Sequence, residues 1–215
     1  MSNQNTNTDE RTALVVIDIQ NDYFPGGACE LEGVEAAADK AVRVIGAYRE
    51  LGLPVIHIQH LMQPERGYPF FLEGTPGQEI HPKVAPAPGE PIVVKNYPSS
   101  FQGTNLESLL RELKVERVVI VGNMTQACVC STGHSAFERG FAVTVVGDAT
   151  ATRALQLGDE IVPAEQIHRA NLASLDGLFA HVTTTDRYLK ELAGSLSAGA
   201  QISQVEVLTA LSRGS

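Results

Sequence analysis

Two patterns of apolar and polar positions alternate along the chain. Short runs of consecutive apolar residues, many of them β-branched, are typical of strands that are buried on both faces of a parallel sheet. Each run is bounded by Gly, Pro or charged residues, which are typical of turns. The runs that predict strands are Ala13–Ile19, Val55–His60, Pro91–Lys95, Val118–Val121, Phe141–Val146 and His181–Thr184.

Longer stretches between these runs repeat apolar residues every three or four positions, which is typical of helices that bury one face. This spacing predicts helices over residues 34–51, 104–114, 126–139 and 163–179, and a last helix that begins at Arg187. Thr104 and Glu107 have the spacing of a capping box. Strands and helices that alternate over the whole length predict an α/β fold, with a mainly parallel six-stranded sheet between two helical layers.

One domain, residues 12–195, accounts for both patterns, and no internal repeat or linker divides it. Residues 1–11 are polar throughout and lack the apolar segment of a signal peptide, so we expect a disordered tail on a cytoplasmic protein. Residues 196–215 form a C-terminal extension that contains the sequence VEVLTALS. This sequence fits either a helix docked on a neighbour or a frayed end.

Composition narrows the range of partners. The net charge is −9, and the chain has no cluster of Lys and Arg that could bind nucleic acid or an anionic membrane. No apolar stretch approaches the roughly 20 residues that a membrane-spanning helix needs. The three cysteines lack the spacing of a zinc site, and no Gly-rich phosphate loop follows a predicted strand. We therefore expect a small-molecule substrate, or else a protein surface, as the partner, and no cofactor.

Asp18, Lys95 and Cys128 each stand at or just beyond the carboxyl end of a predicted strand. In an open parallel sheet these ends face one crevice. A thiol could attack a substrate there while the carboxylate takes its proton and the ammonium keeps the carboxylate charged. We expect the ammonium to lower the pKa of the thiol. The backbone N–H groups of the turn GNMTQAC could bind an oxyanion.

Other interpretations of the cysteines and histidines stay open. An isolated Cys in an apolar stretch is often only structural. A redox pair of Cys128 and Cys130 is disfavoured because positions two apart on a helix do not face each other. His134 lies nearly two helical turns beyond Cys128, too far for direct contact, while the remaining histidines stay open as its partners. His57 and His60 point to opposite faces of their strand, so they could share a metal only if His60 lies past the strand's end.

A long Pro- and Gly-rich segment, residues 62–90, separates the second and third predicted strands. Loops of this length in a compact domain are often lids or binding loops. Aromatic residues near the strand ends suggest a partly apolar pocket. The candidate substrate-binding residues are Gln20, Phe24, Tyr97, Phe101 and Asn123.

Several motifs follow one another along residues 12–190. They are LVVIDIQNDYF at the first strand, GTPGQEIHP in the long segment, VVKNYPSSFQGTNLESLL around the lysine and GNMTQACVCSTGHSAFERGFAVTVVGDATATR at the thiol. With these motifs the chain resembles the isochorismatase-like cysteine hydrolases, a superfamily that includes nicotinamidases, N-carbamoylsarcosine amidohydrolase and ureidoacrylate hydrolases. The resemblance implies a sheet order of 3-2-1-4-5-6 and a homo-oligomer, a dimer or larger. We expect residues 62–90 and the C-terminal tail at its interface.

The resemblance also implies roles for individual residues. By motif position, Asp18, Lys95 and Cys128 correspond to the catalytic triad of the superfamily. A non-proline cis peptide bond is implied before Met124, and the backbone amides of Met124 and Cys128 correspond to the oxyanion hole.

The chain departs from the nicotinamidases at their metal site. Those enzymes place an Asp-x-His motif and a further His after the second strand, whereas Gln59 and His60 stand where the motif would begin here. The sequence therefore favours a metal-independent hydrolase of a small amide or related C–N bond, with a thioester intermediate at Cys128. Two alternatives stay open. They are a catalytically silent binding or regulatory protein on the same fold and an isochorismatase-type enol ether hydrolase.

Overall fold

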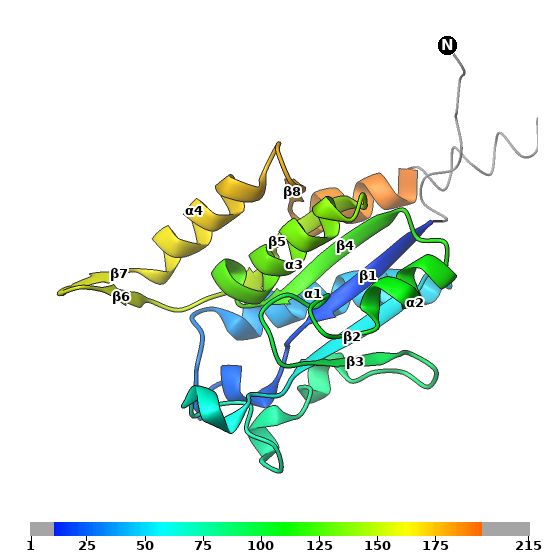
Figure 1. Ribbon diagram of the computed structural model, residues 1–215. Helices are drawn as coiled ribbons and strands as arrows, with labels where there is room; N and C mark the ends of the chain where they lie inside the picture. Colours follow the sequence, from blue (N-terminus) through cyan, green and yellow to red (C-terminus); the bar gives the residue numbers. More distant parts are fainter. Residues whose placement is uncertain (1–10, 195–215) are drawn as a thin grey trace, which may run out of the picture.

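A six-stranded parallel sheet forms the centre of the molecule (Figure 1). The structure is a computed structural model and describes residues 11–194. The strands are β1 Thr12–Ile17, β2 Val55–His60, β3 Ile92–Lys95, β4 Arg117–Asn123, β5 Ala142–Ala151 and β8 His181–Thr183. Their order across the sheet is β3-β2-β1-β4-β5-β8, and β8 is the sixth strand of this sheet along the chain. The predicted α/β fold and strand order are therefore confirmed.

Helices cover both faces of the sheet and complete the three layers (Figure 1). One face carries α1 and the helical residues 185–194, and the other carries α2, α3 and α4. The helices are α1 Val34–Glu50, α2 Leu106–Glu112, α3 Cys130–Glu138 and α4 Ala164–Leu175. None of the described helices has the length and hydropathy needed to cross a membrane.

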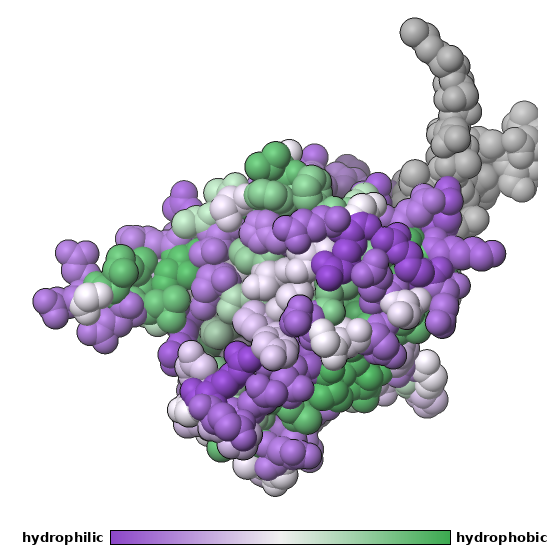
Figure 2. Space-filling model, in the orientation of Figure 1, coloured by the Kyte–Doolittle hydropathy of each residue, from purple (hydrophilic) through white to green (hydrophobic). Residues whose placement is uncertain are grey.

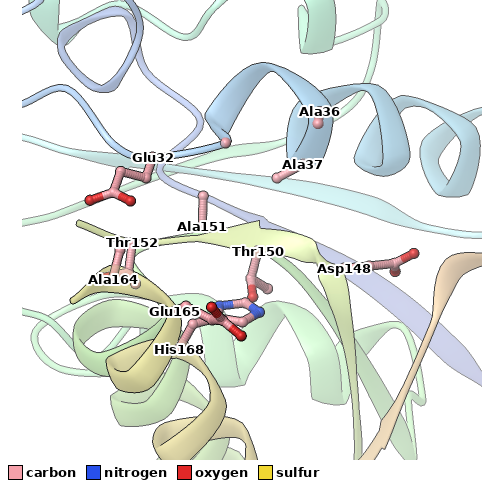
Figure 3. Close-up of a pocket in the computed structure, with 11 residues that line it drawn as sticks. Glu32, Ala36, Ala37, Asp148, Thr150, Ala151, Thr152, Ala164, Glu165 and His168 are labelled. Atoms are coloured by element: carbon pink, nitrogen blue, oxygen red, sulfur yellow. The ribbon is translucent and has the colours of Figure 1, made fainter. Parts of the chain in front are cut away.

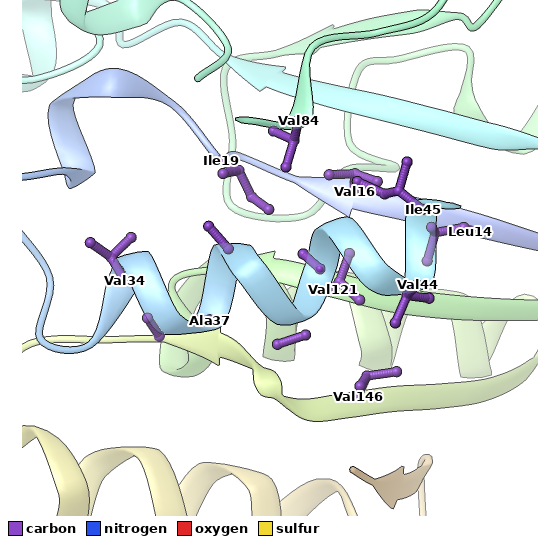
Figure 4. Packing of buried hydrophobic residues seen from close by; sticks show 14 of the residues in the cluster. Leu14, Val16, Ile19, Val34, Ala37, Val44, Ile45, Val84, Val121 and Val146 are labelled. Carbon is purple, nitrogen blue, oxygen red and sulfur yellow. The ribbon is translucent and has the colours of Figure 1, made fainter. Parts of the chain in front are cut away.

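β1 lies inside the sheet, and its side chains alternate between two hydrophobic cores. Leu14 and Val16 belong to the core under α1, where Figure 4 shows them beside Ile45 of that helix. Val15 and Ile17 belong to the core on the opposite face. Full burial of such a side chain stabilises the fold by roughly 1.5–3 kcal/mol. Both faces of β1 therefore select apolar residues, and this is why its sequence is a continuous apolar run.

β5 is longer than the apolar run Phe141–Val146 predicted. It continues to Ala151, so the strand end predicted at Val146 was wrong. The register between β4 and β5 shifts after the pair of Ile120 and Val145, where β5 has extra residues, and the strands pair again at Gly122 and Thr150. The apolar pattern is interrupted by Gly and Asp at this point, although the backbone pairing goes on.

A short hairpin that the sequence did not predict projects from the domain between β5 and α4 (Figure 1). Its strands are β6 Leu155–Leu157 and β7 Glu160–Val162. Leu157 and Ile161 are 73% and 72% exposed, and Figure 2 shows hydrophobic surface on this arm. Strands of three residues without a buried face do not show the alternation of apolar and polar residues from which strands are predicted.

α2 begins at Leu106, two residues later than predicted. Thr104 Oγ1 accepts a hydrogen bond from the Leu106 N–H at 3.3 Å, as a cap does. Glu107, however, forms ion pairs with Arg111 and Arg139. The Glu107 half of the predicted capping box was therefore wrong, because two guanidinium groups compete for its carboxylate.

The two chain ends that we expected outside the domain, residues 1–11 and 196–215, lie outside the described residues apart from Arg11. The carbonyl of Arg11 accepts hydrogen bonds from the backbone N–H groups of Glu116 and Arg117. These contacts fix the entry of the chain into β1 beside the start of β4.

Polar side chains fasten the long segment between β2 and β3 to the carboxyl ends of β1 and β2. Asp22 Oδ2 accepts a hydrogen bond of 2.6 Å from the Phe71 N–H. The Nε2 groups of Gln20 and Gln59 both donate to the carbonyl of Gln78. Short helical turns within the segment cover Pro64–Arg66, Pro76–Gln78 and Pro82–Val84. The segment is thus a folded cover over the strand ends.

Glu90 closes this segment just before β3. Its carboxylate accepts hydrogen bonds from Arg49 of α1 at 2.7 and 2.8 Å and from the Ala87 N–H at 2.8 Å, and it lies 2.9 Å from His57 Nε2. Hydrogen bonds from Arg49, and to a smaller extent from Ala87 and His57, lower the pKa of Glu90 to about 2. Partial burial acts in the opposite direction and raises this pKa. Because this pKa lies below the ordinary 4.5, the charged carboxylate stabilises the fold.

We predict that Glu90→Gln lowers the free energy of unfolding at pH 7 by about 1 kcal/mol, a value that allows for solvent screening of a partly exposed pair. The contribution is complete above pH 4.5 and is lost as the pH falls toward about 2, where wild type and variant converge. Urea unfolding at several pH values measures it. Glu107→Gln, which breaks a more exposed pair, is the control and should cost less. A difference that stays constant from pH 7 to pH 2 contradicts the assignment.

Candidate active site

Asp18, Lys95 and Cys128 meet at the carboxyl edge of the sheet, and we refer to them as the Asp–Lys–Cys cluster. Lys95 Nζ lies 2.8 Å from Asp18 Oδ2 and 3.1 Å from Cys128 Sγ. The three residues are 0%, 1% and 3% exposed. The sequence placed each of them at a strand end, and the parallel sheet brings these ends together as predicted.

The backbone holds Asp18 in a conformation that most residues avoid. It follows β1 with a φ of 48°, in the left-handed region that Asp tolerates better than most non-glycine residues. Its N–H still donates to the carbonyl of Ile58 in β2. The chain therefore leaves the sheet directly at the carboxylate, which turns toward the neighbouring strand ends.

The thiol sits in a π-helical turn, Thr125–Val129, that links β4 to α3. The Asn123–Met124 peptide bond before it is cis, as the resemblance implied. The Val129 N–H donates to the carbonyl of Met124 at 3.2 Å, a wide turn of the kind that often occurs at functional sites. The turn thus presents the Cys128 side chain toward the ends of β1 and β3.

Glycine is required where β4 enters this turn. Gly122 has a φ of 115°, and a Cβ on it would stand 2.0 Å from the carbonyl oxygen of Ile17 in β1. The extended end of β5 supports the turn from the other side. Asn123 Oδ1 accepts a hydrogen bond from the Ala151 N–H, and Thr125 Oγ1 donates to the Ala151 carbonyl.

The Lys95 ammonium is the centre of the cluster. In addition to the carboxylate and the sulfur, its Nζ lies 3.0 Å from the Tyr97 carbonyl, 3.1 Å from the Pro98 carbonyl and 3.2 Å from His60 Nδ1. An ammonium has three N–H donors and no acceptor. Five acceptors therefore surround one cation, which compensates for its removal from water.

His60 is a member of this site that the sequence left open as a metal ligand or as a partner of Cys128. It ends β2, directly across from Lys95 in the parallel pairing of β2 with β3. Its Nδ1 lies 3.7 Å from Asp18 Oδ2 and 3.9 Å from Cys128 Sγ. His60 also stands at the carboxyl end of a strand, the same feature that predicted the Asp–Lys–Cys cluster. This feature could have identified His60 as a site residue.

Charges in the cluster stabilise one another. Burial raises the pKa of Asp18, but the Lys95 ammonium outweighs burial and holds that pKa below its usual value. Burial lowers the pKa of Lys95, but the Asp18 carboxylate outweighs it and raises that pKa above its usual value. Both groups are therefore charged at neutral pH.

The thiol does not follow the prediction. Burial and the Asp18 carboxylate raise the pKa of Cys128 to about 12, although the Lys95 ammonium acts in the opposite direction. Our expectation of a lowered thiol pKa was therefore wrong, since it weighed the cation without the burial and without the adjacent carboxylate. The resting site holds a neutral thiol beside a charged carboxylate.

One known protein family matches most of this chain. The model of the isochorismatase domain matches residues 12–187. The chain belongs to the isochorismatase family.

Relatives of this family member span nearly its whole described length. It is 45% identical over 179 residues to the uncharacterized isochorismatase family protein YddQ of Bacillus subtilis. This alignment covers 83% of the present chain and 99% of YddQ. It is 29% identical over 195 residues to the maleamate amidohydrolase of Pseudomonas putida, covering 85% of this chain and 87% of that enzyme. The crystal structure of an Oleispira antarctica protein assigned as an isochorismatase hydrolase superposes with a TM-score of 0.80, at 38% identity, over 88% of this chain and 99% of that one.

The predicted substrate-binding residues of this isochorismatase-family chain are dispersed around the cluster. Gln20 is fully buried, and its amide bonds the His60 backbone N–H and carbonyl and the Gln78 carbonyl, which is a scaffolding arrangement. Asn123 is also buried and bonds β5. Phe24 stacks on His81 with ring centroids 3.6 Å apart.

Two further candidates, Tyr97 and Phe101, lie in the loop between β3 and α2. Tyr97 is partly exposed, and the Arg66 guanidinium stands 4.7 Å above its ring. Phe101 is buried against Phe141 and lies under the Arg139 guanidinium. A pattern of aromatic residues does not distinguish rings that stack on neighbouring side chains from rings that line a pocket.

The question of a metal centres on His60. Ligand atoms of Asp18, His60 and Cys128 lie within 4.8 Å of one another, which suits a metal ion by residue type. The Lys95 ammonium, however, lies within 3.2 Å of an atom of each of them, so it already provides the positive charge among these donors. His57, as expected from its place in β2, faces away and approaches Glu90.

A cavity of about 370 Å³ opens beside the thiol-bearing turn (Figure 3). It lies between the N-terminal ends of α1 and α4 and the end of β5, and Glu32, Asp148 and His168 are among its lining residues. His168 Nδ1 is 2.9 Å from Thr125 Oγ1, so the cavity touches the turn. No member of the Asp–Lys–Cys cluster is among its lining residues, which sets it apart from the candidate active site.

We predict that Asp18→Asn and Lys95→Met shift the alkylation of Cys128 by iodoacetamide in opposite directions. Loss of the carboxylate removes one cause of the raised pKa of Cys128, so the rate rises at a lower pH than in wild type. Loss of the ammonium removes the cause that lowers this pKa, so the rate rises at a higher pH. Peptide mass spectrometry between pH 7 and pH 11 measures both profiles.

Cys130 is the internal control for this experiment. Burial raises its pKa to about 11, and its Sγ contacts Asn171 outside the cluster. Its alkylation profile should be the same in all three proteins. Shifts of Cys128 in the same direction in both variants contradict the charge arrangement.

Proposed function

We propose that the protein hydrolyses a small amide or a related C–N bond through a thioester on Cys128, with no metal in the reaction. The observation that carries the proposal is the position of the Lys95 ammonium, 2.8 Å from Asp18 and 3.1 Å from Cys128 in a site closed to solvent. A thiol and a carboxylate that both contact one ammonium are the components of nucleophilic catalysis.

Asp18 is the general base in this proposal. A carboxylate oxygen and Cys128 Sγ lie within 4.8 Å, and no described residue donates an aligned hydrogen bond to either oxygen of Asp18. The Lys95 contact is an ion pair, which leaves lone pairs of the carboxylate free to take a proton. Because the pKa of Cys128 is about 12, almost no thiolate exists at neutral pH, and the thiol needs such a base when it attacks.

Acylation consumes the thiol and releases the amine. Cys128 Sγ forms a bond to the substrate carbonyl carbon while its proton passes to Asp18. The backbone N–H groups of Met124 and Cys128 stabilise the resulting oxyanion, a contribution of roughly 3–4 kcal/mol per donor in enzymes where it has been measured. The C–N bond then breaks, and the proton on Asp18 passes to the leaving nitrogen.

Deacylation restores the enzyme. Water attacks the thioester carbonyl while Asp18 takes a proton from it, and the C–S bond breaks to give the carboxylic acid. The proton on Asp18 returns to the sulfur, so the net reaction adds one water across the C–N bond. Throughout both steps the Lys95 ammonium stabilises negative charge on the carboxylate and on the sulfur.

The named relatives support this bond type. The similar Pseudomonas putida protein is a maleamate amidohydrolase, and another relative is a ureidoacrylate amidohydrolase of Methylobacterium radiotolerans. Amides and ureides share a carbonyl carbon that a thiol can attack and a nitrogen that leaves after protonation. This shared chemistry favours a C–N bond over an enol ether as the substrate bond of the present protein.

We predict that Cys128→Ala lowers ammonia release from the best substrate in a panel of small amides, ureides and carbamoyl compounds by about three orders of magnitude or more. Cys130→Ala is the matched control and should stay within about threefold of wild type, since the Cys130 side chain contacts Asn171. Turnover by the Cys128 variant at the rate of the wild type would contradict the mechanism. Absence of turnover by the wild type across the panel favours a binding protein.

Hydroxylamine should compete with water for the thioester. We predict that adding it during turnover diverts part of the product to a hydroxamate, which a ferric chloride assay detects, with an equal loss of free acid. Formation of acid alone, at any hydroxylamine concentration, argues for direct attack of water on the substrate.

A further inference from the structure

His60 has one ring nitrogen that is in contact with the cluster and one that is not. The residue is 5% exposed, and its Nδ1 lies 3.2 Å from Lys95 Nζ. Its Nε2 is fully buried, and within residues 11–194 no group forms a hydrogen bond with it. Buried polar atoms are usually paired, so an orphan of this kind in an active site requires an explanation.

The neighbouring ammonium determines which nitrogen carries the proton. An ammonium can only donate, so the Nδ1 of His60 must accept through its lone pair. A neutral imidazole with an accepting Nδ1 carries its hydrogen on Nε2. A proton on both nitrogens would direct an N–H at the positively charged Nζ, which is unfavourable. The orphan atom is therefore an N–H donor.

Packing limits how far the ring can turn. The His60 and Phe71 rings lie 6.0 Å apart, and Phe71 is completely buried under Tyr23 and Phe70. The backbone of His60 is held on both sides by the amide of Gln20, which bonds its N–H and its carbonyl. These contacts hold the backbone of His60 and place the Phe71 ring beside the imidazole.

We propose that His60 is a substrate-positioning residue whose Nε2–H donates to an oxygen of the substrate. The ring lies 3.9 Å from Cys128 Sγ at its Nδ1, so the other nitrogen of the same ring is within reach of an acyl group bonded to the sulfur. An amide nitrogen does not accept hydrogen bonds, and a hydrocarbon would leave the donor unpaired. This proposal rests on the proposed function and deepens it.

The donor selects a class of substrate. The carbonyl that Cys128 attacks directs its oxygen to the backbone amides, so His60 requires a second oxygen. Half-amides of dicarboxylic acids and acyl ureas carry such an oxygen a few bonds from the scissile C–N bond, whereas simple alkyl amides do not. Leaving the donor unpaired penalises the simple amides, as it does in sites that reject analogues lacking a polar group.

Two substitutions distinguish the function of Nδ1 from that of Nε2. The Oδ1 of His60→Asn can accept from Lys95 as Nδ1 does, but the variant lacks a donor at the Nε2 position. The amide of His60→Gln reaches the Nε2 position with a donor. Maleamate and cis-crotonamide are matched probes, since they differ in the carboxylate that replaces a methyl group. We expect His60→Asn to raise KM for maleamate by about tenfold, a larger change than in kcat, and His60→Gln to restore much of it. Equal KM effects of the two variants overturn the proposal.

A spectroscopic experiment tests the donor without a substrate. In protein with ¹⁵N-labelled histidine, assigned with His60→Asn, we expect the neutral His60 ring to carry its proton on Nε2 and none on Nδ1. Alkylation of Cys128 with iodoacetamide attaches a carbonyl oxygen, whereas methyl methanethiolsulfonate attaches a methylthio group that lacks one. The Nε2–H should exchange with water about tenfold more slowly in the first adduct than in the second. A proton on Nδ1, or equal exchange in the two adducts, overturns the proposal. These outcomes do not depend on turnover, so they are distinct from a failure of the proposed function.

Discussion

Asp18 and Lys95 face each other across 2.8 Å in a place that solvent does not reach, at the carboxyl ends of β1 and β3. Burial would destabilise either charge alone by several kcal/mol, so neither group is tolerable there without the other. The pair also sets the state of the thiol. Its carboxylate helps burial raise the pKa of Cys128 to about 12, and its ammonium contacts the sulfur. In the proposed mechanism, the same carboxylate that keeps the thiol protonated at rest removes its proton during attack.

The parallel sheet creates this arrangement from residues far apart in the sequence. β1 lies between β2 and β4, and the side chains that follow β1, β2, β3 and β4 all emerge at one edge. The extended end of β5 fixes the turn that carries Cys128, and the segment between β2 and β3 closes over the same edge. Because the polar atoms of Gln20 and Asp22 fasten that segment, the closed site is built into the fold.

The sequence was sufficient for the fold because buried strands must be apolar on both faces, and β1 and the Val118–Val121 run of β4 show this pattern directly. It also predicted that Asp18, Lys95 and Cys128 lie together, since each stands at a strand end. Their catalytic roles stay a prediction. The raised thiol pKa could not be predicted, because it depends on burial and on the 2.8 Å approach of two charges. The roles of Gln20 and Phe101 could not be predicted either. Gln20 forms hydrogen bonds, and Phe101 ring contacts, with residues that are remote in sequence. The exposed hairpin β6–β7 leaves no apolar pattern.

The central claim is that Asp18 and Lys95 activate Cys128 as one unit. The most direct measurement is a double-mutant cycle on kcat/KM for ammonia release, with wild type, Asp18→Asn, Lys95→Met and the double variant. If the pair acts as a unit, either single substitution removes nearly all of the rate enhancement and the double variant is little worse than either one. Losses in the two single variants that multiply in the double variant would show independent contributions and would contradict the account.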